Sequence, residues 1–69
     1  MEFREDDRVQ FPDPLDDGAI TDGRFLSIDV GNPIEVPASG GGSRMVDAAW
    51  VAREDGTTAR VPHSAIRAA

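Results

Sequence analysis

Glycine and proline interrupt this chain so often that it cannot form a long helix. Turn-forming pairs such as Asp17-Gly18, Asp22-Gly23 and Asp55-Gly56 recur along its 69 residues, and five prolines stand among them. Glycine adopts the positive φ of tight turns and proline removes a backbone donor, so the segments between them are short. The spacing predicts an all-β domain of short strands joined by turns.

Alternation of apolar and polar residues marks the individual strands. Residues 8–11 and 24–30 both show the period of two that is typical of half-buried strands in an antiparallel sheet. The side chains predicted to point into the core from these two strands are Val9, Phe11, Leu26, Ile28 and Val30.

A hairpin over residues 45–61 is the most distinct local motif, with Asp55-Gly56 supplying the positive φ that its turn needs. The face of the first strand that carries Trp50 has no charged residue, so we expect Trp50 in the core. Pro62 and the residues after it predict one helical turn, followed by a short closing strand at Ile66. These segments bring the predicted number of strands to five.

Residues 31–44 form the one long connection. Ile34 and Val36 alternate with polar residues and predict a brief edge strand between prolines. The glycine run after them has no side chains to pack, so we expect a flexible loop over residues 37–44. The predicted organisation is an N-terminal acidic tail over residues 1–5 and a single domain over residues 6–69.

The order of these motifs is similar to that of a known family. An acidic turn before Val9, a strand ending in Asp29-Val30, a strand bearing Trp50, an Asp-Gly hairpin and a closing Val61-Pro62 segment resemble the SH3-like small β-barrels. That group includes Tudor, KOW and short bacterial and phage domains. The resemblance implies a five-stranded SH3-like barrel with one short helical turn near the C-terminus, used for binding rather than for catalysis.

Composition excludes several classes of site. The chain has no cysteine, which removes disulfide frameworks, zinc fingers and thiol nucleophiles. No run of apolar residues approaches the length of a membrane span, and the first residues are acidic rather than those of a signal peptide. We therefore expect a cytoplasmic protein without a cofactor.

The net charge of −6 lies entirely in the first third of the chain, because residues 1–23 hold eight carboxylates and two arginines while the remainder is balanced. Nucleic acids and anionic membranes would be repelled by that segment, so we expect neither as a direct partner. The acidic residues that could instead engage a basic partner are Asp13, Asp16 and Asp17. The competing interpretation is that they only promote solubility.

No catalytic or metal-binding constellation is evident. His63 is the only imidazole, and beside Pro62 it is expected to be an exposed turn residue rather than part of a catalytic triad. Asp13 and Asp17 match two positions of a calcium-binding loop, but Arg24 stands where that loop needs its bidentate carboxylate. The sequence predicts neither an enzyme nor a metal site.

An exposed aromatic residue beside an arginine is a favoured anchor for protein contacts. Phe25 is expected either to form such a surface patch with Arg24, Ile34 and Val36 or to pack beneath the long connection. The expected function is a small non-enzymatic protein-binding module or accessory protein. The alternatives are an acidic inhibitor of the phage or mobile-element type, which mimics nucleic acid on a basic host protein, and a structural subunit of an oligomeric assembly, since a homo-oligomer would add buried area to a small core.

Overall fold

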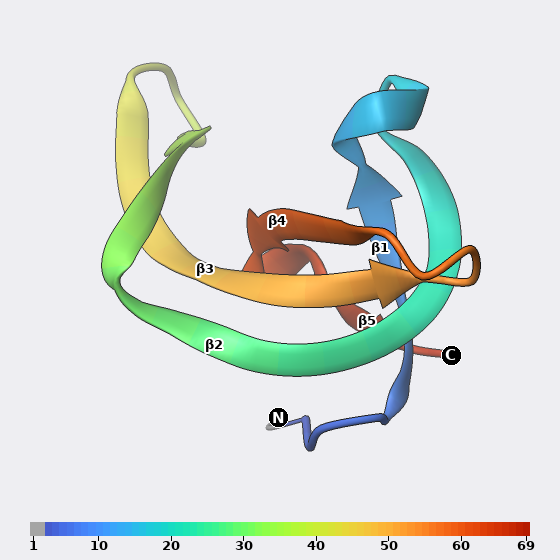
Figure 1. Ribbon diagram of the computed structural model, residues 1–69. Coiled ribbons are helices and arrows are strands. Elements are labelled where there is room, and N and C mark those ends of the chain that lie inside the picture. The colour runs from blue at the N-terminus through green and yellow to red at the C-terminus, as the bar shows by residue number, and fades with distance from the viewer. Residues whose placement is uncertain (1–2) are drawn as a thin grey trace.

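Five antiparallel strands form one sheet in the computed structural model, which describes residues 3–69. The strands are β1 (Arg8–Asp13), β2 (Ala19–Pro37), β3 (Ser43–Arg53), β4 (Thr58–Pro62) and β5 (Arg67–Ala68), and two single-turn 3-10 helices, η1 (Pro14–Asp16) and η2 (His63–Ala65), follow β1 and β4. Their order across the sheet is β4-β3-β2-β1-β5 (Figure 1). The predicted all-β class and the number of strands are confirmed.

Local sequence explains where the strands turn. Pro14 opens η1, the Asp13 carboxylate accepts a hydrogen bond from the Leu15 amide, and Asp17 ends the turn in the left-handed region at φ 53°. Gly56 has a φ of 90° in the turn between β3 and β4, as the Asp-Gly pair predicts. The hairpin and the helical turn before the closing strand are confirmed.

The long connection predicted over residues 31–44 is mostly strand. β2 continues through it, and Ile34 and Val36 pair with Val46 and Arg44 of β3. The register shifts twice along this pair of strands, once between Phe25 and Ser27 and once between Asp29 and Ile34. Beyond the second shift, residues 30–47 form a two-stranded ribbon, here called the arm, which bends away from the rest of the sheet (Figure 1).

The structure describes part of the predicted N-terminal tail, and it pairs the two ends of the predicted flexible loop with each other. Residues 1 and 2 of the predicted acidic tail lie outside the described residues, whereas Phe3 packs against the core. Strand pairing extends to Pro37 and Ser43, so the turn at the tip of the arm is shorter than the predicted loop over residues 37–44.

Among residues 3–69, nine hydrophobic side chains are buried. They are Val9, Phe11, Phe25, Ala48, Ala49, Val51, Ala59, Val61 and Ile66. The inward orientation predicted for Val9 and Phe11 is confirmed. Leu26 is only half-buried, and Ile28 and Val30 are exposed, because the register shift after Phe25 and the departure of the arm carry this part of β2 away from the core.

Trp50 corrects the prediction for β3, because 37% of its surface is exposed. Its neighbours Ala49 and Val51 point inward and pair with Val61 and Ala59 of β4. The sequence favours the face of Trp50 because the face of Ala49 and Val51 also carries the charged residues Asp47 and Arg53. In the folded chain the guanidinium of Arg53 is neutralised by Asp13, so this face can be buried in spite of its charge.

Gly23 allows three strands to approach closely. A Cβ atom at this position would overlap the carbonyl oxygen of Ala52 on β3 and lie 2.8 Å from the ring of Phe11 on β1. The sheet is strongly curved as a result, but β4 and β5 are its two edges and are not paired with each other. It is therefore an open sheet rather than a closed barrel. None of the helices in residues 3–69 is long and apolar enough to cross a membrane.

Candidate functional site

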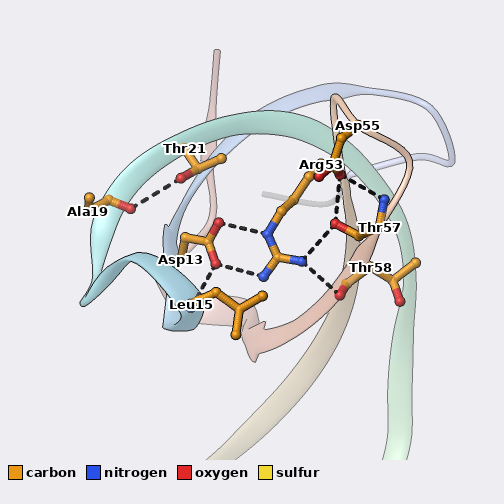
Figure 2. Close-up of polar contacts among 8 residues, drawn as sticks. All are labelled: Asp13, Leu15, Ala19, Thr21, Arg53, Asp55, Thr57 and Thr58. Carbon is orange, nitrogen blue, oxygen red and sulfur yellow. Dashed lines mark hydrogen bonds and ion pairs between the residues drawn. The ribbon is translucent and has the colours of Figure 1, made fainter.

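A buried ion pair ties the β1–β2 turn to the β3–β4 hairpin. The Arg53 guanidinium donates through Nε to Asp13 Oδ2 at 2.7 Å and through Nη2 to Asp13 Oδ1 at 2.6 Å, a two-point contact of matched planes (Figure 2). Its remaining terminal nitrogen donates to the Thr57 hydroxyl and to the Thr58 carbonyl. Only 4% of Asp13 is exposed.

These contacts set the protonation of both partners. The hydrogen bonds from Arg53 lower the pKa of Asp13 to about 2, and the same contact raises the pKa of Arg53. Nearby, the hydrogen bond from the Thr57 hydroxyl lowers the pKa of Asp55. The groups shown in Figure 2 are thus hydrogen-bonded to one another, and together they fix the β1–β2 turn against the β3–β4 hairpin.

The acidic residues predicted as a partner surface, Asp13, Asp16 and Asp17, therefore differ in their exposure to solvent. Asp13 is enclosed and satisfied by Arg53, so its carboxylate does not face a partner. Asp16 and Asp17 are exposed on η1 and its end. Sequence reasoning missed the role of Asp13 because its partner lies 40 residues away in the chain, with no local signal to connect them.

Phe25 is also internal, with 3% of its surface exposed. Its ring centroid lies 5.6 Å from that of Phe3 and 6.2 Å from that of His63. The expectation of a surface patch at Phe25 is wrong, and so is that of an exposed His63, because these three rings pack together. Within residues 3–69, His63 Nε2 is buried without a hydrogen-bond partner.

Trp50, rather than Phe25, is the exposed aromatic residue beside an arginine. It lies on the side of the sheet opposite the core, which we call the outer face; its cross-strand neighbours there are Ser27 on β2 and Arg60 on β4. Arg60 donates through Nε to Asp29 Oδ2 at 2.8 Å and also contacts the Asn32 carbonyl. The hydrogen bond from Arg60 lowers the pKa of Asp29. Trp50 is thus an exposed indole beside a fixed guanidinium.

A pocket of about 340 Å³ is formed by residues of β1, β2 and the end of β3. Its lining residues are Arg8, Gly23, Arg24, Ala52, Arg53 and Glu54. Arg8 and Arg24 are directly opposite each other across β1 and β2, and Arg24 is also opposite Ala52, two residues after Trp50 on β3. Within residues 3–69 neither arginine forms an ion pair, so both guanidiniums remain able to donate hydrogen bonds.

The other residues predicted for a partner site are placed apart from this pocket. Ile34 and Val36 are half-buried on the arm, beyond the second register shift. Of the predicted residues, only Arg24 lines the pocket. One feature of the sequence is consistent with an exposed Trp50: Ala49 and Val51, on the other face of the same strand, are apolar and can form the core instead. That interpretation requires Arg53, which shares their face, to be buried as well.

The described part of the chain shows no group of three or more His, Asp or Glu side chains placed to hold a metal ion. Comparison with protein-family models, with curated proteins and with solved structures finds no match for this chain. Its function is therefore argued from the geometry of the outer face.

Proposed function

We propose that this chain is a small non-enzymatic module that binds another protein through its outer face. The observation that carries the proposal is the exposure of Trp50 on β3, directly opposite Arg60 of β4, with Arg24 of β2 opposite Ala52 two residues further along β3. Tryptophan and arginine are the residues that most often dominate the energy of protein interfaces. An indole has a large apolar surface, and burying it against a partner would be favourable.

The neighbouring pocket gives this surface a polar component. Arg8 and Arg24 each have donors free for a carbonyl or carboxylate oxygen of the partner, next to the apolar contact at Trp50. Both lie on strands that are held in register by backbone hydrogen bonds, so little backbone order has to be created on binding.

We further propose that the sheet belongs to the SH3-like small barrels. The closing strand β5 returns to pair with β1 after a single helical turn, and this supports the resemblance in the sequence. Fold alone does not identify a function. The proposal of a binding role therefore depends on Trp50 and its arginines.

Differential capture tests the binding role. The wild-type chain and the variants Trp50→Ala, Arg24→Gln and Leu15→Ala are immobilised and exposed to lysate of the organism that encodes the chain. Leu15 is a matched control, because it is an exposed hydrophobic residue outside the outer face. We expect at least one protein to be retained by the wild type and by Leu15→Ala but lost with Trp50→Ala, and to bind directly when purified. If no retained protein depends on Trp50, the proposal is wrong.

The inhibitor alternative makes a different prediction in the same experiment. A mimic of nucleic acid would lose its partner with the double variant Asp16→Asn/Asp17→Asn and keep it with Trp50→Ala. Its binding would also weaken steeply as salt is raised, since exposed charges are screened over about 10 Å at 0.1 M salt.

A further inference from the structure

Two arginines face each other across β1 and β2. Arg8 and Arg24, here called the arginine pair, are direct cross-strand neighbours; both are exposed, and each adjoins a buried residue in its strand, so both point to the outer face. The amide of Phe25 donates to the Asp7 carbonyl at 2.9 Å. The adjoining arginine pair is therefore of the non-hydrogen-bonded type, in which facing Cα atoms are only about 4.5 Å apart. Like charges directly opposite each other are destabilising, and an anion between the two guanidiniums would remove that cost.

The carboxylates closest to the arginine pair are not its counterions. Asp22, the adjacent residue on the same side of β2, accepts a hydrogen bond from the Gln10 side-chain amide at 3.0 Å. Glu54 is part of the pocket lining but forms no ion pair within residues 3–69. Arg53, the third arginine of the lining, is paired with Asp13. The arginine pair is therefore open to an anion from outside the chain.

The pocket at the arginine pair is suited to a polar group. Its volume is about 340 Å³, and none of its lining residues has a large apolar side chain. A carboxylate has two oxygens with about four acceptor positions, enough to accept hydrogen bonds from both guanidiniums. Its plane also matches the fork of a guanidinium, which favours two-point contacts.

The charge of the lining decides which anion fits. When Arg53 is set aside with its counterion Asp13, the arginine pair contributes two positive charges and Glu54 one negative charge, which leaves one positive charge. The chain as a whole has a net charge of −6, so it repels an anion with several charges. One carboxylate balances the lining, whereas a phosphate group, with a charge of about −1.5 to −2 at pH 7, exceeds it.

We propose that the arginine pair binds a carboxylate of the protein partner. This inference rests on the binding role proposed above and names the chemistry of the partner, an acidic group close to an apolar one. Arg24 lies opposite Ala52, which follows Trp50 by two residues on the same side of β3. Two residues of a strand span about 7 Å. One extended segment of the partner can therefore place an apolar side chain on Trp50 and a carboxylate at the arginine pair.

Titration of the isotope-labelled full chain with short peptides tests this proposal, with the NMR shifts of the Gly23 and Ala52 amides as the readout. The first probe has leucine, serine and glutamate between an acetyl and an amide group, and the second has glutamine in place of glutamate. We expect the glutamate probe to bind with a Kd of about 1 to 20 mM and the glutamine probe roughly fivefold more weakly, as an exposed ion pair permits. A third probe, with glutamine and a free C-terminal carboxylate, identifies a terminal carboxylate as the source if it binds as tightly as the first.

Variants of the chain assign the effect to the pocket. Arg8→Gln/Arg24→Gln should weaken the glutamate probe to the level of the glutamine probe. Glu54→Gln should strengthen the glutamate probe about twofold, because it removes a like charge from the lining. Glu35→Gln is its matched control, since it changes the net charge equally at an exposed position of the arm, and it should have no effect. Circular dichroism checks each fold, and if the double variant does not fold, Arg8→Gln alone should give about half of its effect.

The proposal fails if the two blocked probes bind equally, or if the arginine variants leave the glutamate probe unaffected. It also fails if the glutamate probe does not bind at concentrations up to about 50 mM, or if inorganic phosphate shifts the two amides more than acetate does at equal ionic strength. The binding role is judged separately by capture from lysate. A captured protein that depends on Trp50 but not on the arginine pair retains that role and rejects this inference.

Discussion

Three residues of this domain lie in environments that are unusual for their type. Asp13 is a carboxylate inside the fold, Arg53 is a cation that points toward the core side of the sheet, and Trp50 is the largest side chain and stands at the surface. These assignments are linked. Once Asp13 neutralises Arg53, the face of Ala49 and Val51 can be buried, and Trp50 is turned outward.

Trp50→Ala is therefore expected to affect binding more than stability. We expect the free energy of unfolding to fall by about 1 kcal/mol, compared with about 2 kcal/mol for Val51→Ala, the fully buried neighbour on the same strand. Urea denaturation followed by circular dichroism measures both. A loss from Trp50→Ala that clearly exceeds the loss from Val51→Ala would return the indole to the core.

The ion pair at Asp13 gives the domain a defined response to acid. The pKa of Asp13 is lowered from 3.8 to about 2 on folding, so the folded state favours the ionised carboxylate. This contribution to stability is complete above about pH 5 and is lost as the pH falls toward 2. The difference in thermal midpoint between the wild type and Asp13→Asn should be about 10 °C or more near neutral pH and should narrow through this range. Asp16→Asn is the matched control, because it removes an exposed carboxylate of η1 and leaves the contact between Asp13 and Arg53 in place.

At the scale of strands and turns, the sequence was informative wherever the signal was local. Alternation located β1 and β4, and the Asp-Gly and Pro residues located the hairpin and the turn before β5. The length of β2 and its two register shifts were not predictable, because a shift depends on which residues of β3 lie opposite. The site was less predictable than the fold. Arg24 was anticipated, whereas the pairing of Asp13 with Arg53 and the exposure of Trp50 require contacts between distant segments.

The base of the arm is held by a separate contact. Arg60 on β4 reaches across the buried Ala48 position to Asp29 and to the Asn32 carbonyl in the bend of β2. Removing the guanidinium in Arg60→Gln should loosen this bend and speed amide hydrogen exchange of arm residues such as Ile34 and Val46 by roughly three- to tenfold. Exchange of the core amides of Val9 and Phe11 should change little.

Arg44→Gln provides the control for this measurement, because it removes an arginine from the arm itself without touching the Arg60 contact. The interpretation is wrong if the two variants accelerate exchange equally at low protein concentration, or if Arg60→Gln accelerates exchange throughout the sheet.

The whole molecule is a small, open sheet with little interior and with a projecting arm. With so few buried side chains, the net stability of the fold depends on modest contributions.

The two turns joined by Asp13 and Arg53 have a practical consequence for engineering. A new loop grafted between β3 and β4 has to retain the guanidinium of Arg53, because it also holds Asp13 at the start of η1. A loop exchanged at η1 that replaces Asp13 removes the counterion of Arg53 in the opposite hairpin. A transplant should therefore include both turns together. The tip of the arm contains neither Asp13 nor Arg53, so it is the safer site for insertion.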